Sequence, residues 1–243
     1  MNLIIDVGNT YVKFAVFKDG QLVDKITSKT RRFISGLRTT LKKFDEFERA
    51  IISSVGKLPK AKVDTLQREL NVLILDNNTK VPFKNNYATP KTLGVDRIAL
   101  VSASVQQFPN TNALIIDAGT CITYDFINSK NEYQGGAISP GIRLRYRALN
   151  NLTANLPLLE TEQPKNLIGD STANSIHSGV VYGIVNEIDG IVKEYSQKHK
   201  DLTVILTGGD AEFLSNQLKS GIFANSNFLL EGLNFILEYN LDE

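Results

Sequence analysis

Cysteine, long apolar runs and clusters of like charge are all scarce in this chain of 243 residues. The single cysteine, Cys121, excludes an intramolecular disulfide, which fits a reducing compartment. No apolar run approaches the length that spans a membrane, and the first residues lack the apolar core of a signal peptide. We therefore expect a cytoplasmic protein without a membrane partner.

The chain carries 27 basic and 26 acidic side chains, so its charge is nearly balanced. A nucleic-acid surface needs a concentrated positive stripe, whereas the short basic cluster at residues 29–32 is better interpreted as a solvated loop. We expect no nucleic-acid partner. The hydrophobic fraction of 42% is typical of a globular protein, and the length allows one large domain or two small ones.

Several common site motifs are also missing. The chain has no Walker Gly-x-x-x-x-Gly-Lys-Ser/Thr motif and no Rossmann Gly-x-Gly-x-x-Gly after a strand, which argues against the two commonest nucleotide scaffolds. No Cys/His set has the spacing of a zinc site. We expect Cys121 to be a small packed residue, and His177 and His199 to lie on helix surfaces.

What the sequence does contain is an internal repeat. Residues 3–10 read Leu-Ile-Ile-Asp-Val-Gly-Asn-Thr and residues 114–121 read Leu-Ile-Ile-Asp-Ala-Gly-Thr-Cys, so five of eight positions are identical. Each copy continues, after a tight turn, into a second strand pattern. We therefore predict two α/β domains, 1–112 and 113–243, with the last helix packing back across the boundary. Apolar spacing predicts helices over 33–44, 95–108, 172–198, 211–218 and 229–239, and strands over 50–52, 72–75 and 202–206.

The two repeated hairpin tips suggest phosphate binding. Glycine lets the backbone approach a ligand, and successive N–H groups can form an anion-binding nest. A carboxylate at the strand end can hold a hydrated cation. One such tip alone is more often a plain turn, but two at matching places favour a polyphosphate ligand. The residues concerned are Asp6, Gly8, Asn9 and Thr10 in the first copy, and Asp117, Gly119 and Thr120 in the second.

A third turn of small residues, Thr207-Gly208-Gly209-Asp210, follows an apolar strand and precedes a helix. Taken alone, it is an ordinary β–α turn. Together with the two hairpins it fits the wall of an adenosine site, because glycine lets the backbone lie close to a nucleoside.

In this order the three motifs resemble the phosphate-1, phosphate-2 and adenosine motifs of the actin-like superfamily of sugar kinases, Hsp70 and actin. Four further segments resemble type III pantothenate kinases, and the likeness runs in order from residue 2 to about residue 235. These segments are 92–97 (Thr-Leu-Gly-Val-Asp-Arg), 135–141 (Gly-Gly-Ala-Ile-Ser-Pro-Gly), 152–157 (Leu-Thr-Ala-Asn-Leu-Pro) and 169–172 (Gly-Asp-Ser-Thr). The resemblance implies an α/β fold of duplicated actin-like (ribonuclease H-like) domains, each a mixed five-stranded sheet flanked by helices, with the nucleotide in the interdomain cleft.

The resemblance also implies an activity. It is the ATP-dependent phosphorylation of pantothenate to 4′-phosphopantothenate, the first step of coenzyme A biosynthesis, by a transferase that acts as a homodimer. The implied cofactors are ATP as donor, Mg²⁺ near Asp6, and a monovalent cation, K⁺ or NH₄⁺, at Asp117. Thr172 matches a threonine that reaches pantothenate from the neighbouring subunit.

Asp96 is the implied proton acceptor, because phosphoryl transfer needs an acid near the acceptor hydroxyl. From the residues alone, a helix-capping Asp96 with Arg97 on the surface is the alternative. Lys13 could neutralise phosphate or face solvent. The implied ATP-binding residues are Asp6, Val7, Gly8, Asn9, Thr10, Tyr11, Val12, Lys13, Thr120, Gly208 and Gly209. The implied pantothenate-binding residues are Tyr87, Gly94, Val95, Asp96, Arg97 and Thr172.

Two other functions remain as alternatives. One is a kinase for a different small hydroxy compound on the same fold. The other is a non-catalytic accessory transcription factor of the same family. The intact Asp6, Asp96 and Asp117 favour an active kinase over a catalytically dead relative.

Overall fold

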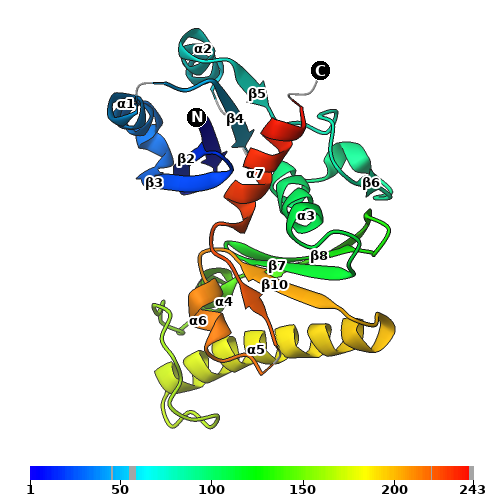
Figure 1. Cartoon of the computed structure of the whole chain (residues 1–243). Coiled ribbons are helices and arrows are strands. Elements are labelled where there is room, and N and C mark those ends of the chain that lie inside the picture. The colour runs from blue at the N-terminus through cyan, green and yellow to red at the C-terminus, as the bar shows by residue number, and fades with distance from the viewer. Residues whose placement is uncertain (45, 55–58, 220, 241–243) are drawn as a thin grey trace. The chain divides into compact units, whose positions relative to one another are not determined.

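The computed structural model describes residues 1–44, 46–54, 59–219 and 221–240 (Figure 1). It divides into two compact units. The second unit begins at residue 110, and the sequence predicted a boundary near residue 112. The chain's last helix, which was expected to pack back across this boundary, is grouped with the first unit. The first unit comprises Met1–Pro109, Asn131–Tyr133 and Asn227–Glu243, and the second comprises Asn110–Lys130 and Gln134–Ser226.

A mixed sheet in the order β3-β2-β1-β4-β5 forms the centre of the first unit. The predicted apolar runs, residues 3–5 and 50–52, are its buried central strands, as expected where both faces of a sheet are covered. β1 pairs antiparallel with β2 and parallel with β4, which places Asp6 between Lys13 and Ser53. The strands are β1 (Asn2–Val7), β2 (Tyr11–Lys18), β3 (Gln21–Lys29), β4 (Arg49–Ser54) and β5 (Val72–Ile74).

Four α-helices belong to the described part of this unit. The helices predicted over 33–44, 95–108 and 229–239 are confirmed, whereas α2 was missed because Leu66 is its one fully buried side chain. α3 and α7 lie side by side (Figure 1), and Gly232 of α7 sits so close to α3 that a Cβ there would lie 2.0 Å from the Ala99 carbonyl oxygen. The helices are α1 (Phe33–Lys43), α2 (Lys60–Glu69), α3 (Val95–Gln107) and α7 (Phe228–Tyr239).

The second sheet is also mixed, in the order β11-β10-β7-β8-β9-β6. In the described part of the chain it therefore has six strands, where the resemblance implied five. The additional strand, β6, is two residues long, too short to leave an apolar pattern, and it pairs with the first residues of β9, which are grouped with the first unit. The strands are β6 (Lys84–Asn85), β7 (Ala113–Ala118), β8 (Cys121–Ile127), β9 (Glu132–Pro140), β10 (Thr203–Thr207) and β11 (Phe223–Ala224).

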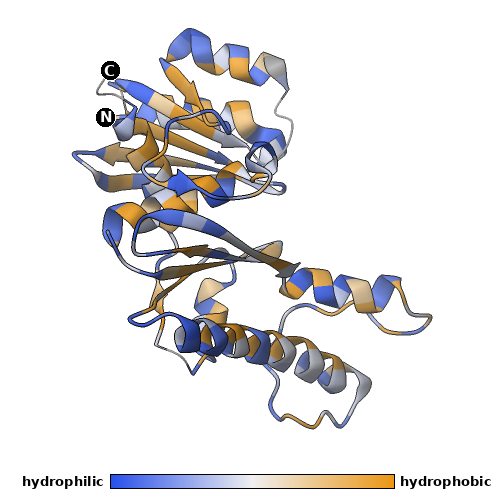
Figure 2. Cartoon of the chain, turned by 90° about the vertical axis from the view of Figure 1, so that its right-hand side faces the viewer, coloured by the Kyte–Doolittle hydropathy of each residue, from blue (hydrophilic) through white to orange (hydrophobic). Residues whose placement is uncertain are grey.

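Helices α4 (Ile142–Asn151), α5 (Thr172–Lys198) and α6 (Ala211–Ser215) belong to the second unit. The long helix predicted over 172–198 is confirmed and is unbroken, and the Ser171 side chain caps its first turn. Apolar residues line the central strands and one side of the helices, where they form the core (Figure 2). None of the described helices is long and apolar enough to cross a membrane.

The two sheets repeat one arrangement. β1 lies between an antiparallel and a parallel neighbour, and so does β7, which pairs with β8 and β10. Asp6 and Asp117 therefore occupy equivalent positions, one residue before each strand ends. The repeated sequence thus corresponds to a repeated strand arrangement that presents the two carboxylates alike.

Candidate active site

The predicted ATP-binding hairpin of the first unit joins β1 to β2. The Gly8 N–H donates to the Tyr11 carbonyl at 2.9 Å and closes the turn. Asn9 and Thr10 are exposed at the tip, where their polar groups face solvent. The two flanking valines, at positions 7 and 12, are buried in the core, so a ligand could reach only their backbone atoms.

Asp6 lies next to this hairpin, with a partner on each neighbouring strand. The Lys13 Nζ is 3.8 Å from Asp6 Oδ2. The Ser53 hydroxyl opposite is buried and has no hydrogen-bond partner among the described residues. Burial raises the pKa of Asp6 above its ordinary value, and the negative charge of Asp96 adds to the rise, although Lys13 opposes it. A cation bound here would therefore stabilise the ionised carboxylate.

Asp96 lies in the first turn of α3. Gly94 is the N-cap, so Asp96 is not the capping residue that the alternative interpretation required. Asp96 Oδ1 accepts the Arg97 backbone N–H at 2.9 Å, and a Cβ on Gly94 would lie 2.4 Å from the same oxygen. Only glycine at position 94 leaves room for the carboxylate to fold back over the helix start. The negative charge is also favoured at a helix N-terminus.

Arg97 is buried, which contradicts the alternative of a surface arginine. Its guanidinium carbon lies 5.6 Å from the centre of the Tyr87 ring and 6.0 Å from that of the Tyr133 ring, a cation–π arrangement. The two tyrosine rings stack on each other. The first unit therefore brings together four residues that were expected to belong to the site, Asp6, Asp96, Arg97 and Tyr87, and adds Tyr133.

Asn77 also shapes this site, and sequence reasoning missed it. Its amide donates to the carbonyl oxygens of Pro90 at 2.9 Å and Leu93 at 2.8 Å. Both carbonyls belong to the turn that leads into α3, so Asn77 fixes the approach to Asp96. The sequence signal that could have identified Asn77 is the polar turn of residues 76–79 after β5, because asparagine in a turn commonly hydrogen-bonds to nearby backbone groups.

In the second unit, Asp117 and the predicted adenosine motif meet. Asp117 lies opposite Thr123 on β8, whose hydroxyl is buried without a hydrogen-bond partner among the described residues. Gly208 has a φ of +97°, and a Cβ there would lie 2.4 Å from Asp117 Oδ1. Only glycine fits this position, both sterically and conformationally.

The tip of the second hairpin consists of Gly119 and Thr120. The Gly119 N–H donates to the Cys121 carbonyl at 2.9 Å, and the Gly141 N–H donates to the Thr120 carbonyl at 3.1 Å. Thr120 is exposed, in a position to meet a ligand. The expectation that Cys121 is packed was wrong: it is exposed, because it begins β8 beside the open tip.

Arg143 and Asp210 link α4 to the turn after β10, and neither was given a role from the sequence. Arg143 Nη1 lies 3.2 Å from Asp210 Oδ1, and the Asp210 N–H donates to the Ala118 carbonyl at 2.9 Å. Burial raises the pKa of Asp210, and the nearby guanidinium partly offsets the rise. The backbone hydrogen bond thus holds the Gly208–Gly209 turn against the end of β7, and the ion pair links the same turn to α4.

Thr172 lies apart from the other predicted residues of its unit. It is exposed at the start of α5 and lines a mostly apolar pocket of about 780 Å³ between α4 and α5. None of the other residues predicted to bind ATP, pantothenate or metal lines this pocket. The apolar side chains of the pocket are Ala148, Leu149, Leu156, Ile176 and Val180.

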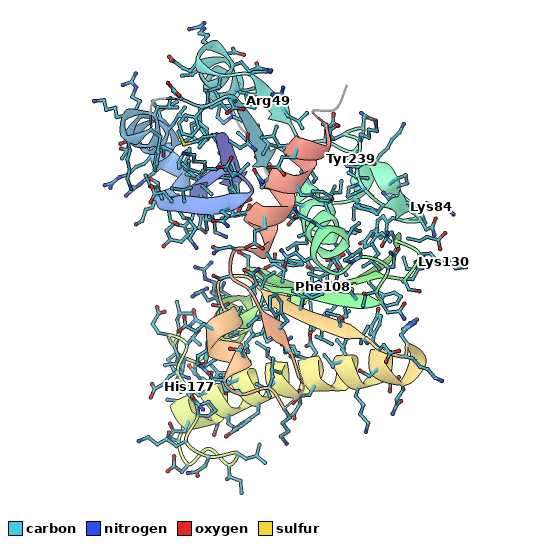
Figure 3. All side chains as sticks on the ribbon, viewed as in Figure 1. Arg49, Lys84, Phe108, Lys130, His177 and Tyr239 are labelled. Carbon is cyan, nitrogen blue, oxygen red and sulfur yellow. The ribbon has the colours of Figure 1, made fainter. Side chains whose placement is uncertain are left out.

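His177, labelled in Figure 3, lies in the first part of α5. It is buried, so the expectation that it lies on a helix surface was wrong. Its Nδ1 is 2.8 Å from the Tyr146 hydroxyl of α4, and its Nε2 is 3.9 Å from Glu162 Oε2. The packing of α4 on this face of α5 explains the burial. Since α4 itself was not predicted, the sequence could not show what covers the histidine.

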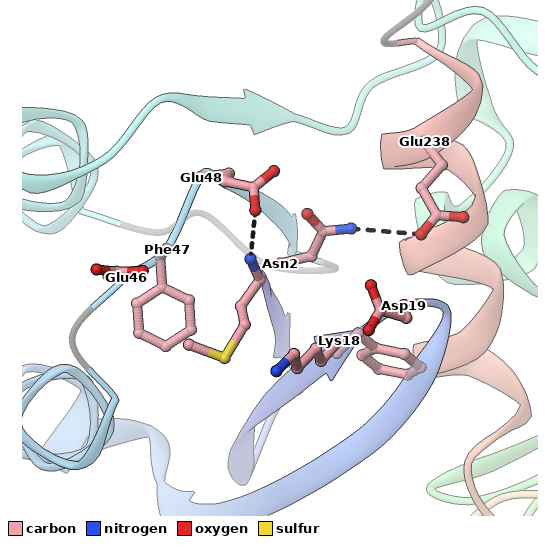
Figure 4. Close-up of a pocket in the computed structure, with 9 residues that line it drawn as sticks. Asn2, Lys18, Asp19, Glu46, Phe47, Glu48 and Glu238 are labelled. Carbon is pink, nitrogen blue, oxygen red and sulfur yellow. Dashed lines mark hydrogen bonds and ion pairs between the residues drawn. The ribbon is translucent and has the colours of Figure 1, made fainter.

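A second pocket, of about 640 Å³, lies at the other end of β1, around Asn2 (Figure 4). Its acidic wall includes Glu48, which pairs with the N-terminal ammonium at 2.8 Å, and Glu238, which accepts a hydrogen bond from Asn2. None of the predicted site residues lines it. The pocket is therefore separate from the groups that could carry out phosphoryl transfer.

Comparison with solved structures identifies the fold of this chain. A Campylobacter jejuni protein named as a Baf family transcriptional activator matches with a TM-score of 0.66 and 22% identity, over 99% of this chain and 100% of that one. A ROK family glucokinase from Streptomyces griseus, solved with glucose and AMPPNP, matches with a TM-score of 0.53 and 11% identity, over 98% of both chains. At these identities the likeness concerns the fold alone, and it confirms the actin-like fold predicted from the motifs.

Comparison by sequence is more specific. The family model of type III pantothenate kinase matches residues 2–194. The type III pantothenate kinase of Christiangramia forsetii is 51% identical over 240 residues, which cover 99% of this chain and 99% of that protein. The described site residues lie mostly inside the matched range, with the Gly208–Gly209 turn beyond it. The chain belongs to the type III pantothenate kinase family.

Proposed function

We propose that this protein transfers the γ-phosphoryl group of ATP to the primary hydroxyl of pantothenate, giving ADP and 4′-phosphopantothenate, the first step toward coenzyme A. Family membership over nearly the whole chain carries the proposal. The grouping of Asp6, Lys13, Asp96 and Arg97 in one unit supports it, because these are the charged groups that the reaction requires.

In this proposal ATP is held by backbone and small side chains. The hairpin from Asp6 to Lys13 binds phosphate oxygens through its N–H groups and the exposed Asn9 and Thr10. Thr120 contacts phosphate from the second hairpin, and Gly208 and Gly209 lie against the adenosine. The ammonium of Lys13, one-third exposed next to Asp6, supplies a positive charge near the phosphates.

Asp96 is the proposed proton acceptor. As the pantothenate oxygen bonds to the γ-phosphorus and the bond from phosphorus to the bridging oxygen of ADP breaks, the hydroxyl proton passes to the Asp96 carboxylate. Arg97, held next to the two stacked tyrosine rings, binds the pantothenate carboxylate or the transferring phosphate. Tyr87, Gly94 and Val95 line the acceptor pocket in this proposal.

Two ions belong to the proposal. No group of three or more acidic, histidine or cysteine side chains forms a ready-made metal site in the described part of the chain. Mg²⁺ commonly uses one or two carboxylates together with phosphate oxygens, and Asp6 beside the unpaired Ser53 hydroxyl fits that role. When bound, Mg²⁺ would neutralise charge on the ATP phosphates. Asp117 and the Thr123 hydroxyl offer the oxygen donors that suit K⁺ or NH₄⁺.

A homodimer is the last part of the proposal, with Thr172 completing the acceptor site of the neighbouring subunit. The exposure of Thr172 beside an apolar pocket supports it, as do Leu152, Leu167 and Ile168 on the loop before α5, which are each at least 70% exposed. Co-expressed Asp96→Asn and Thr172→Ala chains would form mixed dimers with one intact site. Activity above that of either variant alone supports the shared site, and its absence in a verified mixed dimer contradicts it.

An assay of ADP release tests the main proposal. Pantothenate should support turnover, whereas sugars should not, and turnover should require K⁺ or NH₄⁺ in place of Na⁺. Activity on another hydroxy compound, with none on pantothenate, would transfer the assignment to that substrate. No turnover and no ATP binding by the folded protein would reject the kinase function.

A further inference from the structure

Arg145 makes contacts that the proposed reaction does not use. It lies on α4, and its side chain, 21% exposed, bends back toward the end of β9. Its Nε donates to the Pro140 carbonyl at 3.0 Å, and its Nη2 donates to the Ser139 hydroxyl at 3.1 Å. One guanidinium therefore holds two consecutive residues in place. Lysine could not form this forked pair, because its ammonium is a single point.

The guanidinium is itself held by Glu187 of α5, at 2.5 Å from Glu187 Oε2. The other carboxylate oxygen accepts a hydrogen bond from the Tyr124 hydroxyl of β8 at 2.8 Å. Burial alone would raise the pKa of Glu187, but the bonds from Arg145, Tyr124 and Ser139 bring it below its ordinary value. Burial and the neighbouring carboxylate raise the pKa of Tyr124. The network therefore keeps Glu187 ionised and Tyr124 protonated at neutral pH.

The segment that Arg145 holds ends directly beneath the tip of the second hairpin. Gly141 follows Pro140, and its N–H donates to the Thr120 carbonyl at 3.1 Å. A Cβ on Gly141 would lie 2.2 Å from the Gly119 carbonyl oxygen and 2.5 Å from that of Thr120. The contact leaves no space between segment and tip. A shift of the segment must therefore move Thr120.

We infer that Arg145 is a positioning residue for ATP, which sets the place of Thr120 by holding Ser139–Gly141 beneath the hairpin tip. It acts through the backbone and does not touch the nucleotide. The inference rests on the proposed function, because it takes Thr120 as a phosphate contact. Glu187 and Tyr124 act one step further away, by fixing the guanidinium.

A different role for Arg145 must be distinguished. The residue also lines the apolar pocket that contains Thr172, so it could serve the acceptor site or a subunit contact instead. The two roles differ in the substrate they affect. Positioning of Thr120 alters binding of ATP, whereas a role at the pocket alters binding of pantothenate or the oligomeric state.

The test compares Arg145→Met and Arg145→Lys with wild type and with Arg147→Met, a control that removes an exposed arginine from the same helix. Steady-state kinetics give kcat and both KM values, and calorimetry gives the Kd for ATP. We expect Arg145→Met to raise the KM and Kd for ATP about tenfold to a hundredfold, as for loss of charged hydrogen bonds. The KM for pantothenate should stay within about twofold, Arg145→Lys should recover part of the affinity, and Arg147→Met should match wild type.

An unchanged Kd for ATP in folded Arg145→Met, or an equal effect of Arg147→Met, would overturn the inference. So would an effect confined to the KM for pantothenate. If Arg145→Met does not fold, Glu187→Gln and Tyr124→Phe take its place, because they keep the size of the side chain. Each should raise the Kd for ATP by a smaller factor. No rise in either variant would reject the inference. Wild type that binds no ATP would instead refute the proposed function, so the two failures are distinguishable.

Discussion

Replacement of Asp96 by asparagine separates its chemical role from its structural one. The hydrogen bond from the Arg97 backbone N–H to Asp96 Oδ1, at 2.9 Å, can still be made, though more weakly, to the asparagine amide oxygen. The side chains are almost the same size, so the space over Gly94 remains filled. What Asp96→Asn removes is the ability to accept a proton and the negative charge that raises the pKa of Asp6.

The expected loss can be compared for the two roles. A general base typically contributes about 10²–10⁴-fold to a rate, equivalent to roughly 3–5 kcal/mol of activation free energy. A weakened neutral hydrogen bond is worth only about 1 kcal/mol, or about a fivefold effect. We therefore expect kcat to fall by about a hundredfold or more if Asp96 is the proton acceptor. The free energy of unfolding should change little or rise slightly, because a like charge next to Asp6 is gone.

The assay is ADP release at saturating ATP and pantothenate, with ATP affinity from calorimetry and unfolding followed by circular dichroism. Asp96→Asn should bind ATP at least as tightly as wild type, because the repulsion toward phosphate is reduced. A kcat within about tenfold of wild type, at unchanged stability and affinity, would refute the assignment of Asp96 as base.

Three further predictions follow from the same contacts. Asp6→Asn should stabilise the ligand-free protein while abolishing ATP binding. Because the pKa of Asp6 is higher in the folded protein, its ionised carboxylate lowers stability only above the ordinary pKa of 3.8. The increase in the free energy of unfolding, measured with urea, should therefore grow from pH 4 to pH 7. Gly208→Ala should lower the free energy of unfolding by about 1–3 kcal/mol, because the added Cβ strains the backbone and overlaps its neighbours. Gly209→Ala should leave it unchanged, because the space around Gly209 is open. Equilibrium unfolding of the two variants measures the difference. Asn77→Ala should reduce kcat, with the KM for ATP unchanged, because it frees the turn before Asp96; an effect on ATP alone would contradict this.

The fold and the hairpin residues could be predicted because their signals are local. An apolar run that ends in Asp-x-Gly is visible in a few consecutive letters, and its recurrence at residues 3–10 and 114–121 indicated the duplication. Glycines at sites of close approach, such as Gly208, were likewise recognisable from the motif. The resemblance to the family assigned Asp96 and Arg97 to the acceptor site, and that assignment stays a prediction.

The supporting residues could not be predicted, because their roles arise between segments that are distant in sequence. Asn77 bonds a turn thirteen and sixteen residues away, and Tyr133 of β9 lies next to the Arg97 side chain of α3. Arg145 was hidden because the helix that carries it was missed: in residues 142–147 apolar residues alternate with arginines, a pattern that also suits a strand. Because α4 was not predicted, the sequence also offered no reason to expect that His177 is buried.

The packing of α7 on α3 has a consequence for the order in which the enzyme matures. The helix that carries Asp96 rests its backbone against Gly232, and Asn2 of the first strand bonds Asn234 of the same late helix at 2.9 Å. On the ribosome, α7 is translated after the entire second unit. Both α3 and the first strand therefore gain their final support only near the end of translation. Chains that terminate before α7 should therefore be inactive and open to proteolysis.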